Sequence, residues 1–401
     1  MLQTGCTSTS ADTNEQLRAD LDAAIEQAAD YLETQQADNG SWPSQTYGLF
    51  RDGVALTPHV LRSLAQTEPN NTAVQDGLDF IGQHIEAVVD GEGVWRLKPA
   101  VRGPVYFCAD TWLALEHADK PDIPDRYKHA TLKLVLKRLQ ISNDRAPSFA
   151  QHGGWGYGIK PFDNLPDDID WIETFDHGRA KDRIFPNLSA NISATVYALD
   201  VLAPRPSNKP FRDTRYTWAP IKYPALAFAA RCQNFESGDD RFDDGGFFFN
   251  PADAARNKGG PAGTDKHGYA RFHSSGSSTA DGLRVLLLCR VEKDDPRILA
   301  ARDWLFKHFD PEHNPGTFNE DRKILRDAYY FYYAASVADT FTLLGDGPDD
   351  WAQDLAKALI SKQINDGSFA NPFTDGKEDD PLIATPFALR AMLACREAMG
   401  Q

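Results

Sequence analysis

The segments QQADNGSW (residues 35–42) and KQINDGSF (residues 362–369) repeat one phrase near the two ends of the chain: glutamine, three residues, glycine, one residue and an aromatic residue. Looser copies of the phrase lie between them. A phrase that returns along a whole chain is typical of a repeat architecture. With the looser copies there are six glycine–aromatic turns, and the four between the ends finish at Trp95, Trp155, Phe247 and Phe318.

Each turn lies between two helical patterns. Before the first and last turns, apolar residues recur at helical spacing over residues 14–35 and 351–363. The helices that follow the turns are apolar on nearly all sides, so we expect them to be buried. Five of these helices share a phrase that starts with threonine and reaches leucine four residues later, at Thr57, Thr111, Thr195, Thr279 and Thr385.

This alternation predicts an all-α fold, an (α/α)6 toroid in which six inner helices are ringed by six outer helices. An open solenoid would need polar capping repeats at both ends. Here the first and last repeats carry the best-kept phrases, which favours a closed ring. We expect a single domain over residues 15–401, a flexible segment at 1–14, and little β-sheet.

The repeated phrase has a structural role. Glycine allows backbone conformations that other residues resist. The aromatic residue can pack across the junction between neighbouring repeats. The glutamine ends its outer helix and can hydrogen-bond backbone groups at the next helix end. We therefore assign no catalytic role to these turns, whose best-defined glycines are Gly40, Gly154, Gly246 and Gly367.

The composition narrows the range of partners. The chain has 401 residues and a formal net charge of -16, which argues against nucleic acid and anionic membrane surfaces. No apolar run is long enough to cross a bilayer. Five scattered cysteines without CxxC spacing indicate neither a disulfide framework nor a zinc ribbon. The histidines are scattered too, so we expect no metal and no cofactor. The sequence does not indicate an oligomeric state.

The N-terminus leaves two interpretations open. Gly5 and Cys6 precede a polar stretch rich in serine and threonine, which resembles the region around the acylated cysteine of bacterial lipoproteins. The basic and apolar regions of an export signal are missing. The chain is therefore either exported and lipid-anchored through Cys6 or has an ordinary flexible N-terminus, as in a cytoplasmic protein.

Two turns are expanded into long loops, near residues 156–188 and 248–277. Both follow an outer helix and precede an inner one, so an alternating ring places them on the same rim. Insertions on one face of a repeat protein often mark the binding face. We expect these loops to form a lid or a binding wall, with Asp168 and Asp170 as ligand-binding candidates.

The Gln-x-x-x-Gly-x-Trp phrase at the end of an outer helix resembles the repeat of squalene–hopene and other triterpene cyclases. The wider group includes the β subunits of protein prenyltransferases and stand-alone bacterial prenyltransferase and squalene oxidase repeat proteins. The resemblance covers nearly the whole chain after residue 14. It implies a terpenoid cyclase-like toroid whose central cavity binds an isoprenoid or another apolar ligand.

The catalytic motifs of these relatives are missing. When Asp-x-Asp-Asp-Thr-Ala is laid on residues 107–112, Asp110 and Thr111 match, but the protonating aspartate falls on Ala109. The acidic run at 167–170 lies in a loop and has the wrong order. The zinc ligands of prenyltransferases would need Asp-x-Cys, and residues 108–110 have the reverse order. The sequence therefore leaves open whether the chain is an enzyme.

Two acids and several aromatic residues on the inner helices are candidate site residues. Asp110 and Asp281 lie at or near the head of an inner helix, where they are either acid–base groups of the cavity or partners of the helix dipole. The tyrosine-rich run 329–333 covers every helix face, so part of it faces the cavity and part packs in the core. The further cavity candidates are His59, Trp112, Tyr197, Tyr330 and Tyr333.

Three functions fit these observations. The first is an enzyme or binder of an isoprenoid or other apolar molecule. The second is a carbohydrate-active or carbohydrate-binding (α/α)6 protein, and the third is a non-catalytic scaffold at the cell envelope. A fold alone does not separate them. An apolar cavity wall favours the first, a cleft with paired carboxylates and exposed tryptophan the second, and a plugged ring the third.

Overall fold

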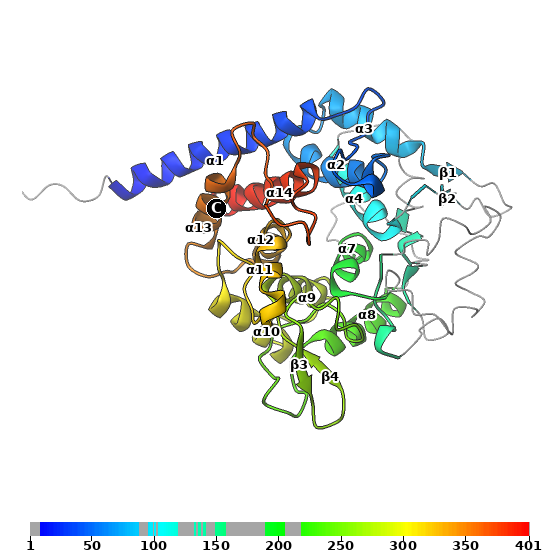
Figure 1. The fold of residues 1–401 in the computed structure, drawn as a ribbon, viewed down its shortest axis with the longest axis vertical. Coiled ribbons are helices and arrows are strands. Elements are labelled where there is room, and N and C mark those ends of the chain that lie inside the picture. Colours follow the sequence, from blue (N-terminus) through cyan, green and yellow to red (C-terminus); the bar gives the residue numbers. More distant parts are fainter. Residues whose placement is uncertain are drawn as a thin grey trace, which may run out of the picture.

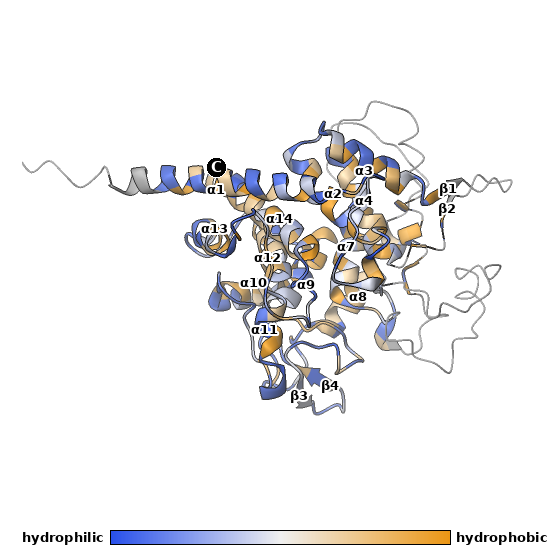
Figure 2. Ribbon diagram, turned by 45° about the horizontal axis from the view of Figure 1, so that its top comes forward, coloured by the Kyte–Doolittle hydropathy of each residue, from blue (hydrophilic) through white to orange (hydrophobic). Residues whose placement is uncertain are grey.

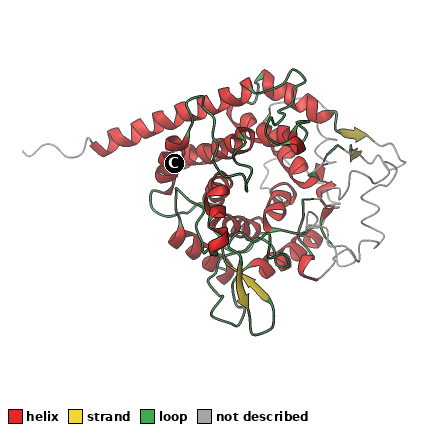
Figure 3. Ribbon diagram, in the orientation of Figure 1, coloured by secondary structure: helices red, strands yellow, loops and turns green. Residues whose placement is uncertain are grey.

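The computed structural model describes residues 9–87, 95–98, 100–101, 103–118, 132–133, 135–137, 139–141, 149–157, 189–204 and 218–400. Asp168, Asp170 and Cys6 lie outside these residues. Figure 1 shows the helices arranged as a ring around a central axis, and Figure 3 shows how few strands accompany them.

The inner layer of the ring is a closed cycle of helices. Each inner helix contacts the next along the chain, and the last contacts the first. This closure confirms the predicted all-α toroid. The inner helices are α2 (Leu56–Thr67), α4 (Pro104–His117), α7 (Ile192–Leu202), α9 (Gly276–Leu288), α12 (Tyr330–Leu344) and α14 (Pro381–Gly400).

The outer layer packs around this cycle. Helix α1 begins at Thr9, inside the segment 1–14 that was expected to be flexible. Its apolar side chains at Leu21, Ala28 and Leu32 are fully buried, and Figure 2 shows it mixing hydrophilic and hydrophobic residues as an amphipathic helix does. The outer helices with assigned bounds are α1 (Thr9–Thr34), α3 (Thr72–Gly82), α8 (Ala219–Cys232), α10 (Pro296–His308) and α13 (Trp351–Lys362).

The described strands form two short antiparallel hairpins, which agrees with the expectation of little sheet. Strands β1 (Ile85–Ala87) and β2 (Trp95–Leu97) pair beside α3, and β3 (Pro261–Thr264) pairs with β4 (Ala270–Phe272) across a bulge. The second hairpin lies within the long loop 248–277 and extends away from the ring (Figure 1). The shorter helices are η1 (Gly48–Phe50), η2 (Phe149–Gln151), η4 (Glu320–Arg322) and α11 (Ile324–Ala328).

At four of the six turns, the repeated glutamine joins one repeat to the next. The Nε2 group of Gln36 donates to the carbonyl of its turn glycine (3.0 Å) and to the carbonyl of Ala73 in α3 (2.8 Å). Gln363 donates in the same way to its turn glycine (3.0 Å) and to Ala24 in α1 (2.9 Å). The last turn is therefore bonded to the first outer helix, which closes the ring. The same arrangement recurs at Gln140 and Gln233.

The turn glycine is required by both conformation and space. Gly367 has φ of +89°, and a Cβ there would lie 2.3 Å from the carbonyl oxygen of Gln27 in α1. Gly40 has φ of +83° and a similarly close approach to α3. In two looser copies, the glycine with this geometry stands one residue earlier than expected, at Gly153 and Gly245 and not at Gly154 and Gly246.

The aromatic residue and the aligned threonine form the other half of each joint. Trp42 is fully buried, and its indole N–H donates to the carbonyl of Leu32 (2.6 Å). Its backbone N–H donates to Oγ1 of Thr57 (3.0 Å) at the head of the inner helix. The same bond links Trp155, Phe247 and Phe369 to Thr195, Thr279 and Thr385. Four of the five aligned threonines thus occupy equivalent positions, because the hydroxyl of each accepts a hydrogen bond from a turn. The exception is Thr111, whose Oγ1 has no hydrogen-bond partner among the described residues.

Two further features of the described residues complete the fold. No described helix is both long and apolar enough to span a membrane. Cys108, Cys232, Cys289 and Cys395 are buried free thiols. Burial raises the pKa of the Cys108 thiol well above its ordinary value, which suits an inert core residue.

Candidate functional site

A cavity of about 790 Å³ lies at the N-terminal ends of the inner helices, and we call it the chamber. Inner helices α2, α4, α7, α12 and α14 contribute to its wall. The long loops contribute as well, through Tyr157 in the first and Phe249 and Lys258 in the second. Its aromatic wall consists of Phe50, Tyr106, Phe107, Tyr157, Tyr197, Phe249, Tyr329, Tyr332 and Phe387.

Below the chamber, a cluster of charged side chains crosses the bore of the ring. Each inner helix contributes one residue, so three arginines meet three aspartates. We call this cluster the ionic belt: Arg62 (α2), Asp110 (α4), Asp200 (α7), Arg284 (α9), Asp339 (α12) and Arg390 (α14).

The belt is held by short ion pairs. Asp339 lies 2.6 Å from Arg390, 3.4 Å from Arg284 and 3.7 Å from Arg62. Burial alone would raise the pKa of Asp339, but these three guanidinium groups lower it below its ordinary value. Asp200 pairs with Arg284 at 2.6 Å. Belt residues other than Asp110 also line a second cavity, of about 1390 Å³, at the C-terminal ends of the inner helices. The belt therefore separates two cavities.

Asp110 is the predicted acid that lines the chamber. Its Oδ1 accepts a hydrogen bond from Arg62 at 3.0 Å, and its Oδ2 lies 3.9 Å from Nδ1 of His59. Burial raises the pKa of Asp110, while attraction to Arg62 and Arg390 opposes this shift. His59 also lines the chamber, and its Nε2–H donates to the carbonyl of Ile383 (3.1 Å). Burial lowers the pKa of His59 to about 3, so the ring is neutral at pH 7.

Asp281 is buried behind the chamber wall. Tyr332, whose ring lines the chamber, donates to its Oδ2 at 2.6 Å, and Ser336 donates to its Oδ1. The chain of hydrogen bonds continues from Tyr332 through Ser193 to Tyr106, with 3.0 Å between the last two hydroxyl oxygens. Burial raises the pKa of Asp281. This chain connects Asp281 to three hydroxyl groups on the wall of the chamber.

Neither acid serves as a helix-dipole partner. Asp110 is the seventh residue of α4 and Asp281 the sixth of α9, and neither helix has an acidic residue in its first turn. Both acids were expected at or near the helix head. Helix α4 begins at Pro104 and α9 at Gly276, and both starts lie before the aligned threonines Thr111 and Thr279.

The tyrosine run 329–333 divides between chamber and core, but the tyrosines that face the chamber are not the two that were expected to do so. Tyr329 and Tyr332 line the chamber. Tyr333 is fully buried, and the hydroxyl of Tyr330 donates to the carbonyl of Pro311 (2.7 Å). Tyr330 and Tyr333 are therefore core residues. Residues three apart share a helix face, so one face carries Tyr329 and Tyr332 toward the chamber and another carries Tyr330 and Tyr333 into the core.

The remaining predicted residues also separate. Tyr197 lines the chamber, with Arg62 5.0 Å above its ring and Arg390 3.3 Å from its hydroxyl. Trp112 is buried beneath Lys133 and is not among the described residues that line the chamber. Asp110, His59 and Tyr197 are thus brought together, whereas Trp112, Tyr330 and Tyr333 pack elsewhere.

Two buried charged residues of the chamber wall were not anticipated. Lys258 comes from the long loop 248–277, and Glu378 comes from the loop before α14. Glu378 accepts hydrogen bonds from the backbone N–H groups of Phe331 (2.9 Å) and Tyr332 (2.8 Å), so it caps α12. Burial raises the pKa of Glu378 to about 8 and lowers that of Lys258 to about 8.

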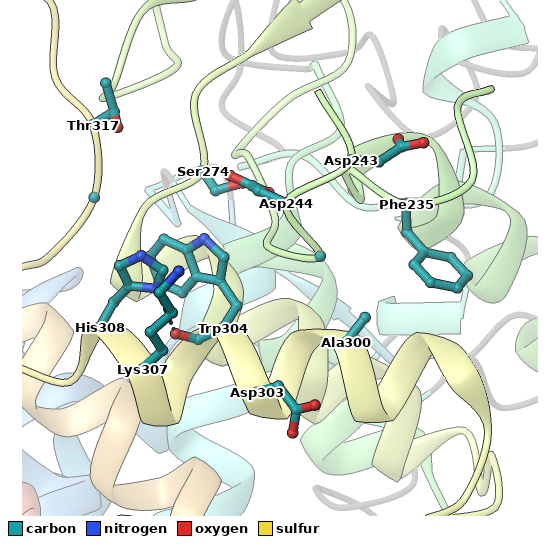
Figure 4. A pocket seen from close by; sticks show the side chains of 12 residues that line it. Phe235, Asp243, Asp244, Ser274, Ala300, Asp303, Trp304, Lys307, His308 and Thr317 are labelled. Carbon is teal, nitrogen blue, oxygen red and sulfur yellow. Dashed lines mark hydrogen bonds between the residues drawn. The ribbon is translucent and has the colours of Figure 1, made fainter. Parts of the chain in front are cut away.

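A third pocket, of about 610 Å³, lies between α10 and the fourth turn (Figure 4). It contains two adjacent carboxylates, but both are engaged in the turn. Asp243 accepts from the backbone of Ser237, and Asp244 accepts from the hydroxyl of Ser274 (2.8 Å). Trp304 is 4% exposed and stacks on His308. The pocket therefore lacks the free carboxylate pair and exposed tryptophan expected of a glycosidase-like cleft.

Among the described residues, no three histidine, cysteine or acidic side chains gather as a metal site.

Comparisons with known proteins place the fold. No family model matches the chain, and no curated protein matches its sequence. Solved structures do match over nearly its full length. The cellobiose 2-epimerase of Spirochaeta thermophila has a TM-score of 0.59 and 12% sequence identity, covering 98% of this chain and 99% of that protein.

A second type of match is the type II terpene cyclase MstE from Scytonema. Its complexes with the product merosterolic acid A and with the substrate geranylgeranyl dihydroxybenzoate each have a TM-score of 0.52 and 11% identity. Each match covers 96% of this chain and 99% of the cyclase. The chain therefore has the α/α toroid fold of terpenoid cyclase-like proteins, a fold that the epimerase shares.

Proposed function

We propose that the chain binds an apolar, isoprenoid-like molecule in the chamber. The observation that supports this most strongly is the chamber itself, with its aromatic and aliphatic wall and a volume of about 790 Å³. This falls within the roughly 300–1,000 Å³ typical of small-molecule sites. Aromatic faces suit polyisoprene chains through dispersion contacts. The Scytonema cyclase, which shares the fold, binds a geranylgeranyl compound.

The ionic belt supports the same proposal by closing one end of the chamber. Because the belt spans the bore, a ligand enters from the rim that carries the long loops and stops at Asp110 and His59. A plugged ring was expected to indicate a scaffold. Here the plug leaves the chamber open above it, so a binding role is favoured over a purely structural one.

The proposal concerns binding, and Asp110 is the candidate acid for any chemical step. It is the predicted carboxyl that lines the chamber, with the neutral His59 beside it. The acid of the triterpene cyclase motif would fall on Ala109 instead. A variant Asp110→Asn should keep ligand binding and lose turnover if such a step exists. Unchanged turnover in this variant would assign the acid elsewhere.

The test is native mass spectrometry after incubation with geranylgeraniol or with cellobiose. We expect one geranylgeraniol per chain and no retained cellobiose. Gly103 lines the chamber, and a Cβ there meets nothing within 4 Å, so Gly103→Phe should fill the chamber without distorting the backbone and abolish retention. Gly48→Phe is the matched control, because Gly48 has equal room outside the lining and should keep the ligand.

A carbohydrate-binding protein is the second candidate. The epimerase match favours it, and aromatic walls also stack on sugar rings. Retention of cellobiose, with no geranylgeraniol bound, would establish this alternative and refute the isoprenoid proposal. If neither ligand binds, the envelope scaffold becomes the better interpretation.

A further inference from the structure

We propose that Lys258 recognises an acidic group, so that the ligand of the chamber is an apolar molecule carrying one carboxylate or a similar anion. This inference rests on the proposed function, because it names the chemical class of the same ligand. It is carried by the surroundings of a single buried ammonium group.

Lys258 lies in an aromatic cage at the chamber wall. Its Nζ is 4.7 Å from the ring centroid of Tyr329, 5.0 Å from that of Phe249 and 5.4 Å from that of Tyr332. The residue is 7% exposed and lines the chamber. Aromatic faces attract a cation, and they fix its position without satisfying its hydrogen bonds.

The ammonium has more donors than partners. Lysine carries three N–H donors, and among the described residues Lys258 has one acceptor, Oγ of Ser277 at 3.2 Å. Ser277 is held in place by Asn314, whose Oδ1 accepts from its backbone N–H at 2.9 Å. Two donors of a buried charge are therefore left without a described acceptor, and the open side of the cage is the chamber.

The nearest acids are occupied by other groups. Asp281 accepts from Tyr332 and Ser336, and Glu378 accepts from the cap of α12 and from Asn371 (3.0 Å). Both attract Lys258 through space, yet no described carboxylate lies within 4.0 Å of its Nζ. In the ionic belt, by contrast, every arginine has an aspartate within that distance.

Burial of an unpaired charge is costly, so a bound anion would stabilise this arrangement. The amine stays largely protonated at pH 7, because its pKa is lowered only to about 8. Charge-assisted hydrogen bonds to a carboxylate are stronger than those to a hydroxyl. The cage therefore selects an anionic group, and the remaining chamber wall selects an apolar chain.

The test compares three ligands that share the same hydrocarbon chain and differ in their polar group: farnesoic acid, farnesol and farnesylamine. Affinities are measured by tryptophan fluorescence and by native mass spectrometry at pH 7. In the wild-type protein, we expect the acid to bind about tenfold tighter than the alcohol, as a charge-assisted bond predicts, and the amine to bind most weakly. Equal affinities for acid and alcohol overturn the inference.

Two variants show whether Lys258 is the group responsible. Lys258→Met replaces the ammonium by an apolar side chain of similar length, so it should remove the preference, and the acid and the alcohol should then bind with equal affinity. Lys362→Met is the control, because Lys362 also lies over a tyrosine ring, 4.8 Å from the centroid of Tyr330, but is not among the residues that line the chamber. The control should keep the preference. If Lys258→Met keeps it too, the assignment to Lys258 is wrong.

The outcomes separate this inference from the proposed function. If farnesol binds and the acid binds no better, the ligand class is wrong and the apolar chamber stands. If none of the three ligands binds, both are overturned. The comparison of acid with alcohol uses the wild-type protein alone, so it decides the ligand class even if Lys258→Met does not fold.

Discussion

The chamber and the ionic belt are neighbouring parts of one bore, and both bury charge. In the belt, three guanidinium groups meet three carboxylates, and Asp339 alone pairs with three arginines. In the chamber, the ammonium of Lys258 faces aromatic rings and one hydroxyl. The two regions differ in whether the protein itself satisfies its buried charges.

This difference separates architecture from function. A buried ion pair adds little net stability compared with apolar packing, but removing one partner costs much, because the other charge stays buried. The belt therefore has a structural role: its ion pairs hold the inner helices together. A lone charge beside a cavity is incomplete by itself, which makes it a candidate for ligand recognition.

Breaking the belt should have the largest effect on stability. Asp339→Asn leaves the buried Arg390 without its closest carboxylate, and we expect the free energy of unfolding in urea to fall by about 3–5 kcal/mol. The control is Asp303→Asn, since Asp303 is 66% exposed and pairs with Arg302 on the surface. That change should stay within about 0.5 kcal/mol. Equal stabilities of the two variants would contradict the structural role of the belt.

Acid should lower the stability of the folded chain through His59, which lies where the chamber meets the ionic belt. Burial lowers its pKa from the ordinary value of 6.5 to about 3 in the folded chain, so the unfolded chain takes up a proton first as pH falls. Stability is then lost as pH falls from about 6.5 to about 3, at up to about 1.4 kcal/mol per pH unit.

The measurement is the unfolding free energy of wild type and of His59→Gln between about pH 6.5 and about pH 4, a range that lies within this window. The variant should show a shallower loss, because it lacks the group that titrates. His267→Gln, at an exposed histidine of the β3–β4 turn, should keep the wild-type slope. An identical slope in all three proteins would assign the acid sensitivity to other groups.

Within the chamber, the hydroxyl of Tyr332 should contribute a smaller amount. Tyr332→Phe removes one of the donors to buried Asp281, which we expect to lower the unfolding free energy by about 1–3 kcal/mol. Tyr269→Phe serves as the control, because that tyrosine is 69% exposed. A wild-type value for Tyr332→Phe would mean that Asp281 gains no stabilisation from the chain of hydroxyls.

Lys258→Met should have the smallest effect on stability. It replaces an incompletely paired buried charge by an apolar side chain, so the unfolding free energy should change by less than about 1 kcal/mol or rise. The difference in unfolding free energy between this variant and Asp339→Asn would distinguish a structural ion-pair cluster from a ligand-recognition site. A loss as large as that of Asp339→Asn would instead make Lys258 part of the structural framework.

Much of the architecture could be predicted from sequence because its determinants are local. A positive-φ glycine and a buried aromatic residue mark four of the six joints, which made the ring recognisable. The looser copies were misread by one residue, since two consecutive glycines at 153–154 and 245–246 left the choice undecided. A five-residue aromatic run likewise has no polar face from which to read its helical phase, so Tyr330 and Tyr333 were placed in the cavity.

The belt was missed although a signal for it exists. In all five helices with the aligned threonine, a charged residue stands five positions later. Arg62, Asp200, Arg284 and Arg390 belong to the belt, whereas Glu116 is exposed and does not. A charge inside a nearly apolar helix needs a partner. The sequence contains these charges, but the partners come from helices far apart in the chain.

The sequence by itself determined the repeat, the joints and the all-α ring, because each depends on the conformation and packing of a few neighbouring residues. The tertiary structure alone decided which buried charges are satisfied. Arg62 and Asp339 meet across the bore, whereas Lys258 reaches the wall of the chamber with two donors left open among the described residues. Whether two charged side chains lie within ion-pair distance depends on how the ring closes. The order of residues along the chain does not give that distance.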